Sequence, residues 1–259
     1  MRILKIPVRP AHIPPLRMSN TQPNAVPGST ARLTREQLEE ILVFDTCTIA
    51  NAIEEFNVRL RNQGFTSPGL QCVTGGFPRV IGYAATFRFR AAEPPMMGKN
   101  PFMQRTDWWS DIRKLPSPLI AVIEDLDPNP GAGSCVGEVH AAILKAFGCE
   151  AVITNGAVRD VPAVTAMDFP MFARSRAVSH SYSHFVDFGQ PVSVYGLTVQ
   201  PGDLLYADCH GVVSIPAPVA TQVAAAAASN RARELRIIQA CQSPDFSEQL
   251  LLQTIQRNL

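Results

Sequence analysis

Apolar residues recur at helical spacing in two segments near the start of the chain, residues 34–42 and 45–56, and both are predicted to be helices. The first opens with a capping box, in which the Thr34 hydroxyl accepts a backbone hydrogen bond and Gln37 reaches back to the start of the helix. Ordered structure is therefore expected from residue 34 onward.

The centre of the chain has the spacing of strands. Residues 79–90 are predicted to be a strand, and polar and apolar side chains alternate from Thr86 to Arg90, which is typical of a half-buried strand. A continuous apolar run at residues 118–124 predicts a strand that is buried on both faces. Shorter strands are predicted at residues 151–154, 169–174, 192–194, 202–207 and 211–215, of which the last two form a hairpin.

Helical spacing returns at residues 138–147, where Gly148 ends the helix, and in the tail at residues 219–240 and 247–256. Strands and helices that alternate between helical ends predict an α/β fold in a single domain. The chain is then divided into a Pro-rich extended arm (1–33), the α/β domain (34–218) and C-terminal helices (219–259) that pack on the domain or on a neighbouring subunit.

The first thirty residues contain six prolines and four basic residues but no acidic residue. An acid-free basic start is also typical of a mitochondrial transit peptide, although the prolines oppose the amphipathic helix that such a peptide needs. Met18 is an alternative start of the chain. We favour an extended arm that lies on a neighbouring subunit.

The charges nearly balance, with 23 Lys and Arg against 22 Asp and Glu. A chain without a basic surplus is not expected to bind nucleic acid, and no apolar run is long enough to span a membrane. The six cysteines are scattered and form no C-x-x-C pair, which argues against a zinc site or a redox dithiol. We expect reduced, mostly buried thiols in a cytoplasmic enzyme.

The segment from Gly131 to Asp160 carries the densest candidate chemistry. Gly131, Gly133 and Gly137 form a G-x-G-x-x-x-G pattern, one residue longer than the dinucleotide-binding fingerprint, so NAD or FAD binding is not favoured. Gly137 precedes a predicted helix, however, and a helix N-terminus binds carboxylate or phosphate well.

Arg159 and Asp160 follow the predicted strand at residues 151–154 and its Asn155-Gly156 turn. Loops after strands in α/β sheets are the usual place for ligands. Arginine offers a planar, charged fork for a carboxylate, and aspartate offers an oxygen ligand for a hard divalent cation. The alternative is an ordinary surface ion pair, which contributes little.

These segments together resemble a known family. Gly137-Glu138, Gly148 and Asn155 to Asp160, with residues 46–53, 80–86 and 199–216, are similar in order and sequence to the RraA-like family. It includes the 4-hydroxy-4-methyl-2-oxoglutarate aldolases and the regulator of ribonuclease E activity A. The resemblance covers about residues 35–240. It implies a swivelling β/β/α-type α-β-β-α sandwich and a homotrimer or dimer of trimers with active sites between subunits.

The resemblance also implies roles for individual residues. Asp160 would hold Mg²⁺ or Mn²⁺, Arg159 would hold pyruvate, and Glu138 would orient metal-bound water. The substrate carboxylate would lie on backbone amides after Gly137, those of Val139 and His140. A 2-keto acid bound in this way can lose its C3–C4 bond through a pyruvate enolate, either by retro-aldol cleavage or by decarboxylation of oxaloacetate.

Three positions depart from the family pattern. Ala163 stands where the aldolase motif carries an acid, Asn155 where aspartate is frequent, and His140 where an aliphatic residue is usual. The motifs do not locate the acid that a neighbouring subunit contributes. Glu234 and Glu248, in the predicted tail helices, are the candidates for it.

Two classes of function remain open. The first is a divalent-metal-dependent lyase that acts on a 2-keto acid, either as an aldolase or as an oxaloacetate decarboxylase. The second is a non-catalytic regulator that binds a ribonuclease E-like protein. A relative with the same metal site and a different substrate is a further alternative, because the acid at position 163 is missing.

Other polar and aromatic residues have ordinary structural interpretations beside functional ones. His140 is either a surface or interface histidine or a substrate contact. Asp208 and His210 are expected to stabilise the turn at a hairpin tip and to pack at an interface. His180 and His184 are either a metal pair or part of a polar loop. Trp108 and Trp109, in a short helix predicted at residues 107–114, are expected in the core and at an interface. Arg231, Arg233 and Arg236 are expected on the solvated face of a long helix.

Overall fold

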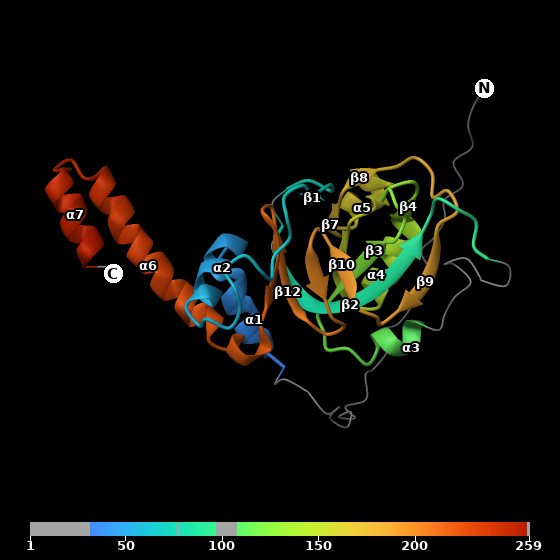
Figure 1. Cartoon of the computed structure of the whole chain (residues 1–259), viewed down its shortest axis with the longest axis horizontal. Helices are drawn as coiled ribbons and strands as arrows, with labels where there is room; N and C mark the ends of the chain where they lie inside the picture. Colours follow the sequence, from blue (N-terminus) through green and yellow to red (C-terminus); the bar gives the residue numbers. More distant parts are fainter. Residues whose placement is uncertain (1–31, 77, 97–107, 258–259) are drawn as a thin grey trace, which may run out of the picture.

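The computed structural model describes residues 32–76, 78–96 and 108–257 (Figure 1). The predicted N-terminal arm lies outside these ranges except for its last two residues. Asp107, the predicted start of a short helix, is also outside them. The described part of that helix is α3 (Trp108–Ile112), which ends two residues earlier than predicted.

One large mixed sheet organises the domain (Figure 1). Its middle strands are parallel, from β7 through β5 and β3 to β2, and antiparallel strands close both sides. The order along the sheet is β1 (Gln71–Cys72), β7 (Met171–Ala173), β5 (Cys149–Thr154), β3 (Leu119–Asp125), β2 (Val80–Arg90), β12 (Leu204–Asp208) and β13 (Gly211–Ile215).

The long strand β2 has different partners along its length. On one edge it pairs with β3 in parallel from Tyr83 to Phe89. On the other edge its first half pairs with β12, and its second half pairs with β9 (His184–Phe188) across an irregularity at Arg88/Phe89. A bulge bends a strand and increases its twist, so β2 can serve two neighbours on one edge.

Two smaller sheets lie beside the large one. A parallel sheet joins β4 (Ser134–Val136), β6 (Ala157–Val158) and β8 (Ser175–Arg176). A hairpin joins β10 (Val192–Val194) and β11 (Leu197–Val199). The parallel sheet is important for the site because it places the ends of β4 and β6 side by side.

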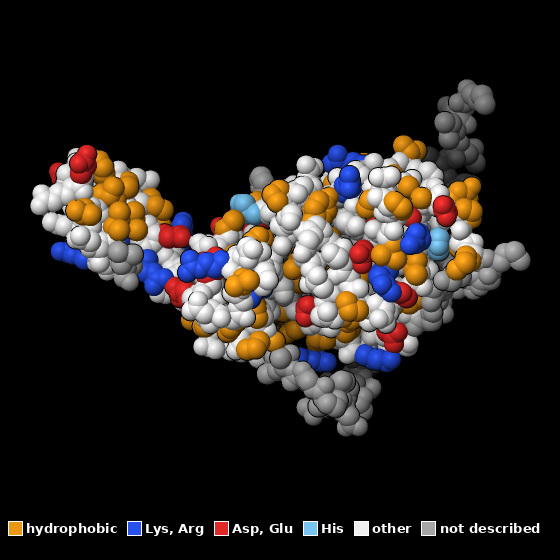
Figure 2. Space-filling model, viewed as in Figure 1, with side chains coloured by type: hydrophobic (Ala, Val, Ile, Leu, Met, Phe, Trp, Pro, Cys, Tyr) orange, Lys and Arg blue, Asp and Glu red, His pale blue; other side chains and the backbone are white. Residues whose placement is uncertain are grey.

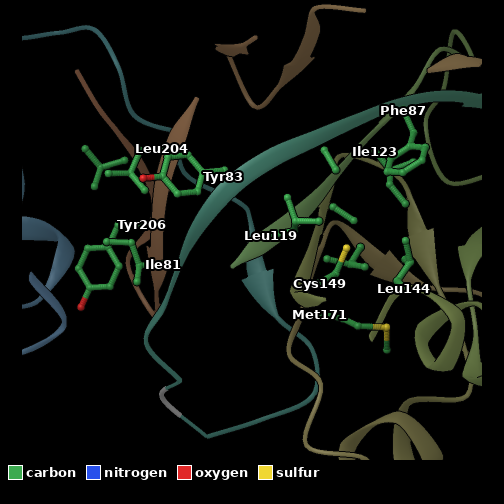
Figure 3. Close-up of a cluster of buried hydrophobic side chains, with 14 of the residues drawn as sticks. Ile81, Tyr83, Phe87, Leu119, Ile123, Leu144, Cys149, Met171, Leu204 and Tyr206 are labelled. Carbon is green, nitrogen blue, oxygen red and sulfur yellow. The ribbon is translucent and has the colours of Figure 1, made fainter. Parts of the chain in front are cut away.

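Successive side chains of β2 and β3 point to opposite faces of the sheet, and both faces are buried. Odd-numbered residues such as Phe87 and Ile123 enter a core shared with the helices, part of which is drawn in Figure 3. Even-numbered residues such as Ala84 and Val122 enter a second core with the β10–β11 hairpin. The predicted buried strand at residues 118–124 is confirmed by this arrangement.

The helices flank this sheet. The first core cluster contains residues of α1, α2, α4, α5 and α6. Their bounds are α1 (Arg35–Leu42), α2 (Thr46–Glu54), α4 (Glu138–Ala146), α5 (Val161–Ala166), α6 (Val223–Gln242) and α7 (Glu248–Gln256), with a 3-10 turn at Ala217–Val219. The capping box at Thr34 is present, and Asp45 caps α2 by accepting a hydrogen bond from Thr48 N at 2.7 Å.

The C-terminal helices form an arm that leads away from the sheet (Figure 1). The body of α6 packs against α2, and α7 packs against α6 without burying any residue of its own. Figure 2 shows apolar side chains on the surface of this arm. Leu235, Phe246 and Leu252 are exposed there in the single chain. Whether a neighbouring subunit covers them stays a prediction.

Two predictions about polar residues are wrong. His184 does not lie in a polar loop, because it opens strand β9 and is buried. The thiols are not mostly buried, because only Cys135 and Cys149 are buried and three cysteines are exposed. Local composition predicts burial poorly for both residue types, because it does not show which strand a side chain joins.

The start of α2 is tied to the hairpin β12–β13 through a buried carboxylate. Asp208 is 3% exposed and accepts hydrogen bonds from Thr46 N at 2.8 Å and from Thr46 Oγ1 at 2.6 Å. Replacing Thr46 with valine removes the hydroxyl donor from a buried charge. The expected loss is about 1–3 kcal/mol of unfolding free energy, measured by urea denaturation.

The matched control is Thr198→Val, at an exposed position on β11. A surface substitution of this kind is expected to change stability by less than about 0.5 kcal/mol. Equal effects of the two substitutions would show that the Thr46–Asp208 contact does not stabilise the fold.

Candidate active site at the start of α4

Parallel pairing of β4 with β6 brings two chain segments together. Ser134 lies opposite Ala157, and Val136 lies opposite Val158. Just beyond the strands, Arg159 N donates a hydrogen bond to Val136 O at 2.9 Å. Gly137 and the Arg159-Asp160 pair therefore meet where both strands end, as expected for a ligand site in an α/β protein.

Asp160 has an unusual backbone and side-chain arrangement. Its φ of 55° lies in the left-handed region, which non-glycine residues rarely adopt. It occupies the N-cap position of α5 but makes no capping hydrogen bond to that helix. Instead, Asp160 Oδ2 accepts a hydrogen bond from Glu138 N, at the start of α4, at 3.1 Å. The carboxylate thus faces the positive end of a different helix.

The surroundings of the carboxylate leave one oxygen available. Arg159 Nε lies 3.4 Å from Asp160 Oδ2, and the side chains of Arg159 and Asp160 are 35% and 41% exposed. Within residues 32–76, 78–96 and 108–257, no hydrogen bond or ion pair involves Asp160 Oδ1. One oxygen is held by a backbone amide and a guanidinium group, and the other accepts no hydrogen bond from the described residues.

Gly137 makes this close approach possible. Its φ of −129° is open to any residue, so the requirement is for space and not for conformation. A Cβ atom at Gly137 would lie 2.4 Å from Asp160 Oδ2 and 3.1 Å from Arg159 Cγ and Nε. Only glycine lets both side chains lie against the first turn of α4.

The first turn of α4 presents backbone amides beside this pair. The first intrahelical bond runs from Ala141 N to Gly137 O at 2.9 Å, so the amides of Val139 and His140 precede the helical ladder. Glu138 and Val139 are exposed. A helix N-terminus next to an arginine is suited to bind a carboxylate.

His140 lies half-buried in the same turn of α4. Burial, followed by the positive charge of Arg159 and the neighbouring His180, lowers the pKa of His140 to about 4. The imidazole is therefore neutral near pH 7.

This depressed pKa has a consequence for stability. The unfolded chain binds a proton at His140 below about pH 6.5, whereas the folded chain does so only near pH 4. Stability from the neutral imidazole is therefore present above pH 6.5 and is lost as the pH falls toward 4. We expect the wild type to lose about 1–3 kcal/mol more than His140→Gln over that interval.

The measurement is urea denaturation of both proteins at pH 7 and pH 4.5. All other titrating groups are shared, so the difference between the two proteins reports on residue 140. Parallel pH dependences would contradict the prediction.

The sequence did not reveal how Asn155 and Asp125 support the site. Asp125 N donates to Asn155 Oδ1 at 2.7 Å, and Asn155 Nδ2 donates to Asp125 O at 3.0 Å. The Asn155 side chain joins the ends of β3 and β5 by donating and accepting at once, which an ionised aspartate cannot do. This explains the departure at position 155.

Asp125 also holds the glycine-rich loop. Its buried carboxylate accepts hydrogen bonds from Gly131 N at 2.7 Å and from Asp127 N at 3.0 Å, and burial raises its pKa. Gly131 adopts a φ of 104°, which glycine allows. The Gly131 amide of the G-x-G-x-x-x-G pattern therefore serves the loop itself.

The structure brings together some of the predicted residues and separates others. Gly137, Glu138, Arg159 and Asp160 meet at the start of α4, with Val139 and His140 in the same turn. The segment containing His180 lies against this loop, since Ser134 N donates to Ser179 O at 3.0 Å. The spacing of the sequence gave no signal for that contact.

Other candidates lie elsewhere. Asp208 and His210 are at the tip of the β12–β13 hairpin, against α2. Glu234 lies on α6, where it pairs with Arg231 at 3.4 Å, and Glu248 opens α7. That Glu234 or Glu248 reaches the start of α4 in a neighbouring subunit stays a prediction. His180 and His184 do not share a helical face, because residues 180–184 are not helical.

Comparison with known proteins identifies the family. The family model described as RraA-like (Aldolase/RraA) matches residues 46–214. The chain belongs to the RraA-like family. The resemblance based on the Gly137-Glu138 and Arg159-Asp160 segments is confirmed by this match.

The RraA-like relatives match only segments of this chain. A protein of Halalkalibacterium halodurans, named "Putative 4-hydroxy-4-methyl-2-oxoglutarate aldolase", is 32% identical over 31% of this chain and 39% of its own length. Protein DlpA of Legionella pneumophila is 28% identical over 53% of this chain and 22% of its own length. The chain thus matches less than half the length of each of these relatives.

Solved structures share the RraA-like fold. An uncharacterized protein from Pseudomonas syringae pv. tomato covers 89% of this chain and 100% of its own, with a TM-score of 0.67 and 23% identity. Streptomyces coelicolor RraAS2, described as an unusual member of the RNase ES inhibitor RraA protein family, covers 79% of this chain and 96% of its own, with a TM-score of 0.63 and 20% identity. The predicted single α/β domain with a helical tail is confirmed.

Among the described residues of this RraA-like chain, no helix combines the length and the hydropathy that a membrane span requires.

Proposed function

We propose that the start of α4, with Arg159 and Asp160, is the active site of a divalent-metal-dependent lyase that cleaves a 2-keto acid and releases pyruvate. The observation that carries the proposal is the Asp160 carboxylate. The carboxylate makes no capping hydrogen bond to its own helix, α5, and instead faces the N-terminus of α4. The backbone of Asp160 is in the left-handed region. A residue held in a rare conformation and turned from its local partners is typical of a functional site.

The donor set fits a hard cation. One carboxylate, with an oxygen that no described group hydrogen-bonds, is the kind of protein ligand that Mg²⁺ or Mn²⁺ takes when substrate oxygens and water complete its coordination. Asp160 is the residue that would hold the cation. Such a cation supplies Lewis acidity, drawing electron density from the keto oxygen of the substrate.

The chain's own residues then orient the substrate. Arg159 offers a fixed positive charge beside Asp160, and the amides of Val139 and His140 offer donors for a carboxylate. Glu138 is exposed at the first position of α4, where it can hold a water molecule that donates or accepts a proton. The negative charge that forms as the C3–C4 bond breaks faces Arg159 and the helix N-terminus.

The exposure of this site fits an active site that a neighbouring subunit completes, in the homotrimer or dimer of trimers that the family resemblance implies. Arg159 and Asp160 are more than a third exposed in the single chain. Catalysis of this kind benefits from exclusion of water. A neighbouring subunit would cover the site and contribute an acid of its own, for which Glu234 and Glu248 are the candidates.

A second candidate is a non-catalytic regulator that binds a ribonuclease E-like protein. The Streptomyces structure named as a member of an RNase ES inhibitor family supports it. A third is a lyase with the same site and another 2-keto acid, which Ala163 favours.

Release of pyruvate tests the proposal. Oxaloacetate and 4-hydroxy-4-methyl-2-oxoglutarate are each supplied with Mg²⁺, with Mn²⁺ and with EDTA, and pyruvate is followed with lactate dehydrogenase. We expect enzyme-dependent release that EDTA abolishes. Release no faster than with the metal alone, for both compounds, would overturn the assignment of these substrates and favour the regulator or the altered substrate.

A further inference from the structure

The tip of the β12–β13 hairpin carries a second group of candidate ligands, outside the site described above. Cys209 and His210 form the turn between β12 and β13, and both are exposed. Asp208, the last residue of β12, is buried. Ligand atoms of these three residues all lie within 4.8 Å of one another.

Asp208 fixes the turn and the imidazole. Besides its two bonds from Thr46, the carboxylate accepts a hydrogen bond from His210 N at 2.9 Å and lies 3.1 Å from His210 Nδ1. A carboxylate that holds one ring nitrogen leaves the other as a lone-pair donor, which is how metal-binding histidines are usually oriented. The group is therefore arranged before any ligand binds.

The spacing of the donors suits a tetrahedral cation. Cys209 Sγ lies 3.5 Å from His210 Nδ1 and 4.0 Å from His210 Nε2. With Zn–S near 2.3 Å and Zn–N near 2.0 Å, two ligands of a tetrahedral zinc ion are about 3.5 Å apart. Because Asp208 holds Nδ1, the available ligand is Nε2, and the side chains of Cys209 and His210 must rotate to bring Nε2 from 4.0 Å to that separation from the sulfur.

A second thiol faces this turn from another element. Cys47 lies in the first turn of α2 and is exposed. Cys47 and His210 line the same cavity of about 300 Å³ between α2 and the hairpin. The Cys47 thiol is thus a further sulfur donor on the same cavity as the imidazole.

We propose that this hairpin tip binds one thiophilic divalent cation of the Zn²⁺ type through Cys209, His210 and Cys47, with Asp208 positioning the imidazole. Thiolate and imidazole donors select zinc-type ions over Mg²⁺. Binding releases the thiol protons to solvent. The ion joins the hairpin to α2, the helix against which α6 packs.

This site differs in chemistry from the one at Asp160. It offers sulfur and nitrogen donors, whereas Asp160 offers carboxylate oxygen. Mg²⁺ in excess is therefore not expected to displace a zinc-type ion from the hairpin tip.

Cobalt spectroscopy and zinc titration test the proposal. The full-length, metal-stripped protein is titrated with Co²⁺, and we expect a thiolate-to-cobalt charge-transfer band that saturates at one ion per chain and disappears on addition of Zn²⁺. Cys209→Ser and His210→Gln are each expected to weaken binding at least tenfold and to reduce the band. Cys47→Ser is expected to do the same, because the proposal makes its thiol the third ligand.

Matched variants keep the outcome clear. Cys241→Ser removes an exposed thiol on α6 and is expected to leave the band unchanged. Asp160→Asn is also expected to leave it unchanged, which separates this site from the proposed active site. The absence of a thiolate band in the wild type, or an equal band in Cys209→Ser, would overturn the proposal.

Discussion

Replacing Asp160 with asparagine is expected to reduce pyruvate release by about a thousandfold or more, because a Lewis-acidic cation contributes several kcal/mol and each 1.36 kcal/mol is tenfold in rate. The substitution preserves the shape of the side chain and the hydrogen bond from Glu138 N. It removes the negative charge that would hold the cation. The measurement is kcat/KM for the better substrate at saturating Mg²⁺.

Asp168 provides a control of the same type. It is also an aspartate whose backbone is in the left-handed region, with a φ of 52°. It follows the C-terminal end of α5, whereas Asp160 precedes the N-terminal end. Asp168→Asn is expected to keep the wild-type rate. If Asp160→Asn keeps it as well, Asp160 does not hold a catalytic metal and the lyase assignment of this site fails.

The second large effect is expected at Gly137. An alanine there places Cβ 2.4 Å from Asp160 Oδ2, so the carboxylate must move away from the start of α4. A displacement of about 1 Å at a catalytic group can cost about a hundredfold in rate. We expect Gly137→Ala to lose at least that much activity while its circular dichroism spectrum stays that of the wild type.

Gly189→Ala is the control that distinguishes a loss of stability from a disturbance of the active site. Its φ is 64°, and a Cβ atom added there would meet no described atom within 4 Å, so Gly189→Ala strains the backbone without crowding a neighbour. It is expected to lower the unfolding free energy and to keep activity. Activity of Gly137→Ala equal to that of Gly189→Ala would mean that close packing at residue 137 is not required.

Long elements with a clear period could be predicted from the sequence. The capping box at Thr34 and the continuous apolar run of β3 each carry enough information locally. Strands β4, β6 and β8 have only two or three residues, so no periodicity exists to detect. Helix α5 was missed because it has six residues and includes Pro162, and β9 because its approach, SHSYSH, is polar.

The site was predictable where its residues are adjacent in the chain. Arg159 and Asp160 follow a strand, and Gly137 precedes a helix, so each pointed to a ligand site separately. That the Asp160 carboxylate lies against α4 depends on β4 pairing with β6, which the sequence does not encode locally. The two-way hydrogen bonding of Asn155 required the same three-dimensional information.

The two partners on one edge of β2 have a consequence for synthesis on the ribosome. Tyr83 pairs with Leu204, which is added about 120 residues later. Until then the first half of β2 presents unpaired backbone groups and an apolar surface, which is the kind of edge on which nascent chains associate. The hairpin β12–β13 therefore completes the sheet late and shields this edge, and chains cut short before residue 204 retain a strand that is open to aggregation.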